Sequence, residues 1–251
     1  MTIPAVSIVM PVHNAGAVLK ETVQSVLDQS FGDYELIMVE DNSSDESLEL
    51  MQRLSASDER IRVLVNNKEH GAAHARNLGI KAARGRYLAY LDADDIWQKD
   101  KLLKTLRFLR KHGASFVFTA YEFGNEKAEG TGKIVHVPRM LDYSHALTRT
   151  VIFTSTVMLD LKKLGKKRVL MPDIPSEDTA SWWKILRSGV TAYGLDENLV
   201  VYRRAGRSLS SNKIVAVKRI WDLYRKREHL SIPLSLCCMI GWGWRATVRR
   251  I

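Results

Sequence analysis

Short apolar runs alternate with amphipathic segments four times within the first 111 residues of the chain. The runs are short enough for buried strands, and the segments between them carry apolar residues at helical spacing. This alternation predicts βαβ units, a mostly parallel sheet and right-handed connections. The predicted strands are 6–12, 34–39, 61–65 and 87–91, and the predicted helices are 18–27, 48–54, 72–83 and 99–111.

The pattern changes after residue 112, where strands predominate. A further helix is predicted at 176–189, with Ser176 as its N-terminal cap and Gly189 at its end. The predicted strands are 114–123, 132–138, 154–160 and 198–204. The chain as a whole is therefore expected to have an α/β fold.

The positive charge of the chain is concentrated at its C-terminal end. The 251 residues carry a net charge of +10, and the last 51 contain 12 Lys or Arg against two Asp or Glu. Residues 1–200 are therefore neutral overall. A basic tail on a neutral body predicts contact with an anionic surface.

Cysteine usage and hydropathy predict a cytoplasmic protein. Cys237 and Cys238 are adjacent and cannot build a disulfide framework, which fits a reducing compartment. The N-terminus lacks a basic stretch followed by an apolar run, so no secretory signal is expected. No apolar run reaches the ~20 residues that a membrane-spanning helix needs.

Polar residues follow each of the first four predicted strands. Because the carboxyl ends of parallel strands meet at one edge of a sheet, where ligands bind, these residues are expected to lie together. One such loop would more often be a simple polar connection, but four together favour a binding site. The loops are PVHN (11–14), VEDNSSD (39–45), NNKEHG (66–71) and LDADD (91–95).

Three carboxylates, Asp92, Asp94 and Asp95, occupy four consecutive positions after the fourth strand. Close carboxylates repel one another and raise each other's pKa values. We therefore expect either a cation among them or side chains that splay into water.

Four segments together resemble glycosyltransferase family 2, and the resemblance covers about residues 5–205. It implies the GT-A fold, with a mostly parallel, Rossmann-like sheet flanked by helices. The implied parts are a nucleotide-sugar-binding half at 1–112, an acceptor and catalytic half at 113–210, and a basic amphipathic helical tail at 211–251. The segments that carry the resemblance are 7–16, 35–45, 71–95 and 176–186.

The sequence Asp92-Ala93-Asp94 looks like the DxD motif of that family. The resemblance implies that Asp94 and Asp92 hold a divalent metal against the diphosphate of the donor, with Asp92 and Ala93 beside the nucleotide. Mn²⁺ and Mg²⁺ both prefer oxygen ligands, so either ion is expected. Asp95 either caps the next helix or lines the acceptor side.

Asp41 and Arg76 match two further positions of the family. Asp41 resembles the residue that accepts a hydrogen bond from uracil; the alternative is a local turn stabilised by its own carboxylate. Arg76 matches the arginine of an ARN motif. It is expected to contact the nucleotide or Asp41, or to form a structural ion pair.

Pro11, Val12, His13 and Asn14 lie where the family surrounds the base. Most members carry Tyr or Phe at the position of His13, which departs from the pattern although histidine can still stack. Because Asp41 matches the residue that contacts uracil, the resemblance implies a UDP-sugar as the donor.

Glu177 and Asp178 match the acidic pair of the family. Asp178 is the implied catalytic base and Glu177 an acceptor contact, because inverting transfer needs a carboxylate that takes the acceptor proton. The alternative is two favourable charges at a helix N-terminus. One of the two tryptophans Trp182 and Trp183 is expected in the core, and the other to stack on a sugar ring. Trp182 is assigned to the sugar.

Residues 202–212 lie where the family closes a loop over the diphosphate. Arginine suits phosphate oxygens, and Arg204 and Arg207 are the candidates chosen here, beside Arg203.

The tail at 213–251 mixes basic residues with Trp242 and Trp244, which is typical of interfacial contact with an anionic membrane. A tail packed on the catalytic domain or a homodimer contact is the alternative. We expect peripheral association with the inner face of the cell membrane.

The resemblance implies a metal-dependent inverting glycosyltransferase that moves a sugar from a UDP-sugar to a hydroxyl of a glycan, lipid-linked, in synthesis of O-antigen, lipopolysaccharide or capsule. A processive synthase would need transmembrane helices and a QxxRW motif.

Two alternatives remain: a nucleotidyltransferase, whose Gly-rich basic loop is poorly matched, and a basic nucleic-acid-binding module, which the neutral body disfavours. No nucleic-acid partner is expected.

Overall fold

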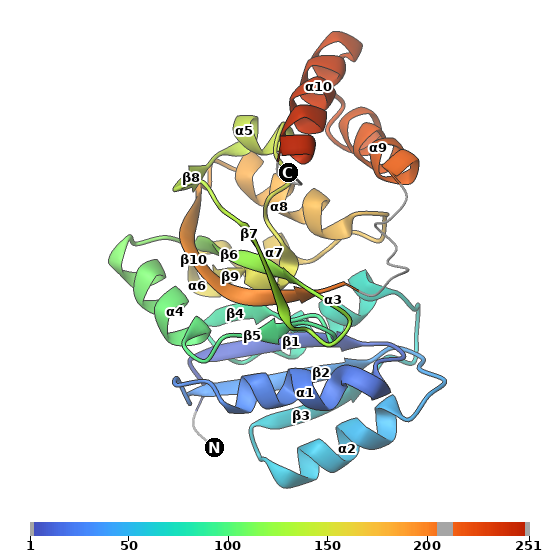
Figure 1. Cartoon of the computed structure of the whole chain (residues 1–251), viewed down its shortest axis with the longest axis vertical. Helices are drawn as coiled ribbons and strands as arrows, with labels where there is room; N and C mark the ends of the chain where they lie inside the picture. The colour runs from blue at the N-terminus through green and yellow to red at the C-terminus, as the bar shows by residue number, and fades with distance from the viewer. Residues whose placement is uncertain (1–2, 205–212, 249–251) are drawn as a thin grey trace.

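A ten-stranded mixed sheet forms the centre of the molecule (Figure 1). The computed structural model describes residues 3–204 and 213–248. The strand order is β3-β2-β1-β4-β9-β6-β10-β5, with β7 beside β6 and β8 beside β10. The strands are β1 (Val6–Val12), β2 (Tyr34–Glu40), β3 (Ile61–Val65), β4 (Tyr87–Tyr90), β5 (Ile96–Trp97), β6 (Phe116–Gly124), β7 (Gly130–Val135), β8 (Met140–Leu141), β9 (Met158–Asp160) and β10 (Ala192–Arg203).

The first four strands are parallel, as the sequence predicts. The order reverses after β3, so right-handed connections place α3 on the sheet face opposite α1 and α2. Gly79 lets α3 lie close to the sheet, because a Cβ there would come within 2.6 Å of a methyl group of Val9 on β1. The helices of this part are α1 (Gly16–Leu27), α2 (Ser47–Ser57), α3 (Ala72–Ala82) and α4 (Lys101–Lys111).

The strand β9 joins the two predicted halves by pairing antiparallel with both β4 and β6. The expected strand at 154–160 is only partly present, since residues Thr154–Thr156 form a 3-10 turn, η1, before β9. The last strand β10 is longer than predicted and runs parallel to β6. One sheet therefore crosses the boundary predicted near residue 112, and the division into domains stays a prediction.

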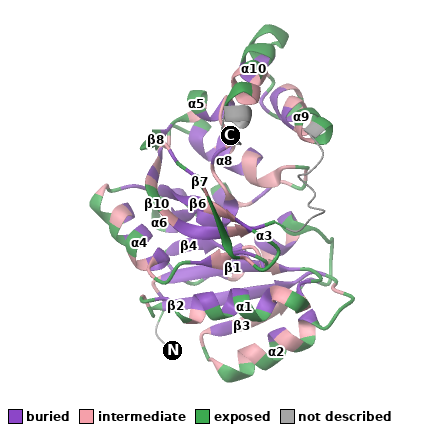
Figure 2. Ribbon diagram, viewed as in Figure 1, coloured by how far each residue is buried: buried purple, intermediate pink, exposed green. Residues whose placement is uncertain are grey.

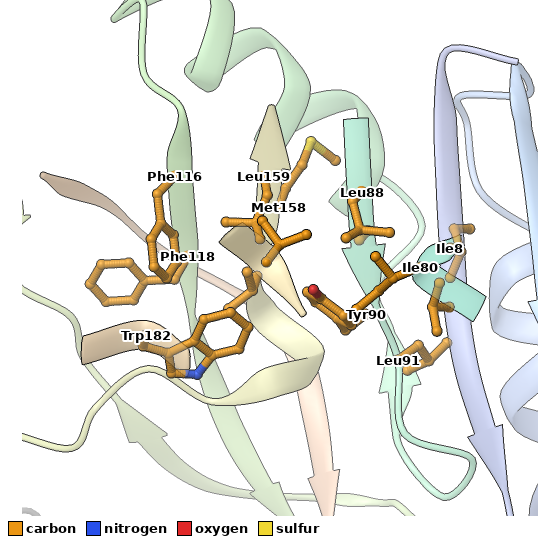
Figure 3. Packing of buried hydrophobic residues seen from close by; sticks show 14 of the residues in the cluster. Ile8, Ile80, Leu88, Tyr90, Leu91, Phe116, Phe118, Met158, Leu159 and Trp182 are labelled. Atoms are coloured by element: carbon orange, nitrogen blue, oxygen red, sulfur yellow. The ribbon is translucent and has the colours of Figure 1, made fainter. Parts of the chain in front are cut away.

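Aromatic side chains pack among aliphatic ones in the core that includes α8 (Glu177–Arg187) and the sheet (Figure 3). The ring of Trp182 lies 5.7 Å from that of Tyr90 and 5.4 Å from that of Phe116, in both cases edge to face. Such pairs add about 0.5–1.5 kcal/mol to the gain from burial alone. This packing fixes α8 against β4 and β6. The other short helices here are α5 (Tyr143–Leu147), α6 (Leu161–Leu164) and α7 (Lys166–Val169).

The C-terminal helices lie at the end of the molecule opposite the N-terminus (Figure 1). They are α9 (Lys213–Asp222), a π-helical turn η2 (Leu223–Arg227) and α10 (Ile232–Val248). Within residues 3–204 and 213–248, no helix combines the length and the apolar character needed to cross a bilayer.

Candidate functional site

The loops that follow β1 and β2 are joined by hydrogen bonds. The Asn14 amide donates to Ser43 Oγ at 3.1 Å, and the Ser44 amide donates to Asn14 Oδ1 at 2.8 Å. Gly16 N donates to Asp45 Oδ2 at 2.9 Å, so the β2 loop also satisfies an amide at the start of α1. Asn14 has a φ of +48°, which asparagine tolerates better than most residues. The two loops form one rigid rim at the sheet edge.

Asp41 is buried beneath this rim and holds the loop that follows β3. Its Oδ1 accepts from Asn66 Nδ2 at 2.9 Å, and its Oδ2 accepts from Gly71 N at 2.8 Å. A local turn stabilised by the Asp41 carboxylate is not formed, because the backbone amide of Ser43, two residues on, donates to the Glu40 side chain instead. His70 Nδ1 also lies 3.3 Å from Asp41 Oδ1. A carboxylate has about four acceptor positions, so capacity for one uracil donor is left.

His13 is exposed at the same edge with its ring fixed in place. Its Nδ1 lies 2.8 Å from the carbonyl oxygen of Asp41, and Asn14 Nδ2 lies 3.2 Å from its Nε2. Pro11 is half-buried, whereas the Val12 side chain is fully buried and the Val12 carbonyl accepts from the Asp41 amide. Val12 can therefore support the base-binding region but cannot contact a base through its side chain.

Asp95 lies in the interior and neither caps α4 nor lines an acceptor surface, contrary to both expectations. Its side chain is fully buried; Oδ2 accepts from Ser155 Oγ at 2.5 Å and Oδ1 accepts from Arg203 N at 3.2 Å. Burial, followed by the negative charges of Asp92 and Asp94, raises its pKa. Asp95 thus anchors the loop after β4 to η1 and β10.

Asp94 is directed to the exposed edge of the loop. The protein around it still desolvates its carboxylate, and this effect, with the charge of Asp92, raises the pKa of Asp94. The loop backbone is fixed on either side: Thr22 Oγ1 donates to the Ala93 carbonyl at 2.9 Å and Arg203 Nε donates to the Asp94 carbonyl at 2.7 Å. Ala93 is buried, so its contribution is to this backbone geometry.

Arg76 connects the loop after β4 to the start of α8. Its Nη2 lies 2.6 Å from Asp92 Oδ1 and its Nη1 lies 2.7 Å from Glu177 Oε1. It is not paired with Asp41. Burial alone would lower the pKa of Arg76, but the charges of Asp92 and Glu177 outweigh burial and raise it. Residues that are 101 positions apart in the sequence thereby belong to one site.

Asp178 lies beside Glu177, at the N-terminus of α8, and is partly exposed. Thr154 Oγ1 donates to its Oδ2 at 3.2 Å, and the Thr179 amide donates to its Oδ1 at 2.6 Å. Burial and the adjacent charge of Asp178 raise the pKa of Glu177. The carboxylate of Asp178 is thus oriented while one side remains accessible.

The expectation that Trp182 contacts a sugar is wrong. Trp182 and Trp183 are each only 2% exposed, and both lie in the core, Trp182 against Tyr90 and Phe116 (Figure 3). The helical spacing of α8 turns both indole rings inward, which leaves neither face open. The predicted cap is also wrong: Ser176 has a left-handed conformation, and its side chain accepts no capping hydrogen bond.

The arginines at the end of β10 and directly after it differ in their roles. Arg203 is buried and pairs with Glu21 at 2.6 Å, so it supports the site from below. Arg204 is exposed and its guanidinium lies 4.8 Å from the centre of the Phe123 ring. Arg207 lies outside the described residues, as does most of the expected closing loop.

The carboxylates of Asp92 and Asp94 fit as ligands of a metal ion that also binds the diphosphate of a substrate. Among the residues that the structure describes, no three or more His, Cys, Asp or Glu side chains are grouped so as to hold a metal ion. Mg²⁺ and similar ions are often held by one or two carboxylates, with phosphate oxygens and water completing the shell. Asp94 and the second oxygen of Asp92 match that pattern, since Arg76 engages only Asp92 Oδ1.

Sequence reasoning missed the supporting residues Thr154, Ser155 and Thr22. Ser155 Oγ accepts from the Asp92 amide at 3.0 Å besides donating to Asp95. The segment at 154–160 resembled a plain strand, so its polar start was the only available indication. Arg203 was considered only as a phosphate ligand.

Replacing Arg76 with Met should lower the free energy of unfolding by about 3 kcal/mol, because it leaves two carboxylates without their shared cation. The value lies at the low end for a buried pair because Asp92 and Glu177 are partly exposed. Urea unfolding followed by circular dichroism measures it. The control is Arg53→Met, which removes an exposed pair with Glu49 and should cost at most about 1 kcal/mol. Equal losses in the two variants would contradict a structural role for Arg76.

Comparison with known sequences identifies one family and several close relatives. The model of the family described as Glycosyl transferase family 2 matches residues 7–168. The chain is 39% identical to the Bacillus subtilis protein TuaG, named for teichuronic acid biosynthesis, over 99% of this chain and 98% of TuaG. It is 36% identical to the Escherichia coli UDP-Glc:α-D-GlcNAc-diphosphoundecaprenol β-1,3-glucosyltransferase WfgD, over 87% of this chain and 84% of WfgD.

Solved structures share the fold at low sequence identity. Staphylococcus aureus TarS 1–349 in complex with UDP-GlcNAc has a TM-score of 0.70 at 18% identity, over 88% of this chain and 64% of that chain. The mannosyltransferase PcManGT of Pyrobaculum calidifontis, in complex with GDP-Man and Mn²⁺, has the same TM-score and identity, over 96% of this chain and 69% of that chain. The α/β architecture is therefore the GT-A fold.

Proposed function

Since the chain belongs to glycosyl transferase family 2 and is a glycosyltransferase, we propose that it moves a sugar from a UDP-sugar to a hydroxyl of a glycan, with inversion and with a divalent metal ion. The relatives support a role in bacterial surface polysaccharide synthesis, since TuaG is named for teichuronic acid and WfgD for transfer to a diphosphoundecaprenol-linked GlcNAc. Family membership argues against the nucleotidyltransferase and nucleic-acid-binding alternatives.

The observation that carries this proposal is the bridge from Asp92 through Arg76 to Glu177. It holds the acidic loop at the end of β4 next to the acidic start of α8. The first would bind the donor diphosphate and the second would meet the acceptor. A transferase needs both reactants at a fixed separation, because positioning supplies a large part of its rate enhancement.

Asp178 is proposed as the catalytic base. Its carboxylate takes the proton of the acceptor hydroxyl as that oxygen forms a bond to the anomeric carbon. The bond from the anomeric carbon to the β-phosphate oxygen breaks, and its electron pair leaves with UDP. Thr154 and the Thr179 amide orient the carboxylate for this transfer. A single displacement of this kind inverts the configuration at the anomeric carbon.

Asp94, together with the free oxygen of Asp92, would hold Mn²⁺ or Mg²⁺. The bound ion supplies positive charge that stabilises the departing diphosphate. The rigid backbone set by Thr22 and Arg203 keeps Asp94 at the edge where that diphosphate would lie. Arg204 is exposed and directly follows Arg203, which contacts the Asp94 carbonyl, so it is the candidate for the same phosphates. Arg207 stays a sequence-based candidate.

The base of the donor is proposed to lie between His13 and Asp41, beside Pro11 and Asn14. His13 offers an exposed ring for stacking, and Asp41 has a remaining acceptor position for the uracil N3–H group. The name of WfgD states UDP-Glc as its donor, which favours UDP over GDP.

The acceptor is proposed to be lipid-linked, as the name of WfgD states for that enzyme. The protein would then act at the inner face of the cytoplasmic membrane, where a lipid-linked intermediate is available.

Calorimetric titration of UDP and GDP, with and without Mn²⁺ or Mg²⁺, tests the donor site. UDP should bind at least about 10-fold more tightly with metal than without it, because the ion offsets repulsion between carboxylates and phosphates. GDP should bind more weakly than UDP. Folded protein that binds neither nucleotide, or binds UDP equally well without metal, would contradict the proposal.

A further inference from the structure

The C-terminal helices expose an unusual share of the apolar surface of the protein. Twelve large apolar residues are exposed in the described part of the chain, and eight of them lie on α9 and α10. Exposed residues cover much of both helices in Figure 2. The eight are Ile214, Val215, Val217, Ile232, Leu234, Leu236, Ile240 and Trp244. A cluster of this kind marks an interaction surface.

Four of these residues form a strip along α10 at intervals of four: Ile232, Leu236, Ile240 and Trp244. Residues four apart share one face of a helix, so the strip runs along its length. Ile240 is 73% exposed and Trp244 is 72% exposed. We call these four residues the apolar strip.

The opposite face of α10 is already used for packing. Ser235 and Cys238 are buried, and Met239 and Trp242 pack against the core. Trp242 Nε1 also donates to Thr150 Oγ1 at 2.9 Å. The apolar strip therefore faces outward because of how the helix is anchored. It cannot reach the core by a simple rotation.

The tail helices are held firmly on the acceptor half of the protein. The ring of Tyr224 on η2 stacks on Trp183 of α8, with centroids 5.3 Å apart and an interplanar angle of 3°. The buried carboxylate of Glu228 accepts from Tyr143 Oη at 2.5 Å and from Arg187 Nη1 at 3.0 Å. The apolar strip is thus presented on a fixed support.

The charge around the strip is positive. Residues 213–248 contain seven Lys or Arg and two Asp or Glu. One of the two acids, Glu228, is buried, and the other, Asp222, lies 3.1 Å from Lys226. Lys218, Lys226 and Arg227 are exposed. Anionic lipid head groups attract basic side chains that lie close to a bilayer surface.

We propose that α9 and α10 dock on the surface of an anionic phospholipid bilayer, with the apolar strip inserted among the head groups. An apolar strip with an exposed tryptophan on α10, beside exposed basic side chains on the adjoining α9 and η2, suits this interface. A second copy of the chain is a poorer occupant, because two such surfaces facing each other would bring like charges together. The inference rests on the proposed function for the membrane location and deepens it by naming the surface that would bind the bilayer.

Docking of this kind would orient the candidate site. The helix α8 contacts the tail through Trp183, whose ring stacks on that of Tyr224, and carries Glu177 and Asp178 at its N-terminus. Figure 1 shows α8 on the side of the sheet where the tail helices lie. The acidic start of α8 would therefore be held at a fixed height above the bilayer.

Sedimentation of the full chain with vesicles tests the proposal. The vesicles are phosphatidylcholine with and without about one-third phosphatidylglycerol. The wild-type chain should pellet with the anionic vesicles. Ile240→Gln with Trp244→Gln should weaken this binding by about 30-fold or more. The matched control, Ile3→Gln with Ile134→Gln, removes two exposed apolar side chains outside the tail and should bind like the wild type.

A charge variant tests the electrostatic attraction between the basic side chains and the anionic lipid. Lys218→Ser with Lys226→Ser should weaken binding to anionic vesicles by about 10-fold or more, and added salt should weaken wild-type binding. UDP binding should be unchanged in all variants, which separates this inference from the proposed function. Equal pelleting of the strip variant and the wild type would overturn the proposal. Absence of vesicle binding together with a dimer that the strip variant dissociates would assign the surface to a second copy instead.

Discussion

Replacing Asp178 with Asn should lower kcat by about 1,000-fold, because the amide cannot take the proton of the acceptor hydroxyl. The side chain keeps nearly the same shape, and Thr154 can still donate to its oxygen. Binding of the donor should therefore change by less than about threefold, since Asp178 contacts no part of the proposed donor site. Initial rates at saturating donor and acceptor, together with calorimetric titration of UDP, measure the two quantities.

The matched control for this variant is Asp173→Asn. Asp173 lies on the segment that leads into α8, is largely exposed and contacts His74 at 3.1 Å. Its replacement makes the same chemical change nearby and should leave kcat close to that of the wild type. If Asp178→Asn kept more than about one-tenth of wild-type kcat, Asp178 would be only a favourable charge at a helix N-terminus.

Replacing Asp94 with Asn should lower kcat/KM by about 1,000-fold and remove most of the metal dependence of UDP binding. The variant loses one of the two carboxylates proposed for the ion, and with it several kcal/mol of charge stabilisation at the departing diphosphate. The fold should persist, because Thr22 and Arg203 hold this loop through its backbone carbonyl groups rather than through the Asp94 side chain. Rates and UDP titrations at several Mn²⁺ concentrations provide the readout.

Asp28→Asn is a suitable control for the Asp94 variant. Asp28 is exposed directly after α1, and its side chain accepts from Gln24 at 2.8 Å. Since α1 starts at the rim of the site, its other end lies at the opposite edge of the sheet. The control should retain metal-dependent binding of UDP. An Asp94→Asn protein that responds to Mn²⁺ as the wild type does would mean that the acidic loop serves another purpose.

The sequence alone was sufficient for the first part of the fold, residues 6–91. In residues 6–91 the secondary structure follows the local periodicity of apolar residues. The strands β1 to β4 and the helices between them therefore lie close to where they are predicted. The parallel order then follows from connection rules, and it brings the loops after β1, β2 and β4 to one edge.

The details of the site depended on contacts that sequence spacing does not reveal. Arg76 pairs with Glu177, which is 101 residues away, and Arg203 supports a loop that is 109 residues away. A polar pattern such as that of Asp92 to Asp95 also does not say which carboxylate turns inward. Asp95 does so because Ser155 and the Arg203 amide satisfy it there.

The hydrogen-bonded rim formed by the loops after β1 and β2 limits how donor preference can be altered by engineering. Asn14, Ser43 and Asp45 each serve the neighbouring loop as well as their own. A graft of residues 13–16 that lacks Asn14 would leave the Ser44 backbone amide without its acceptor. A graft of 41–47 that lacks Ser43 and Asp45 would do the same to the backbone amides of Asn14 and Gly16. The two segments form one modular unit, and a chimera with a new donor preference has to exchange both together.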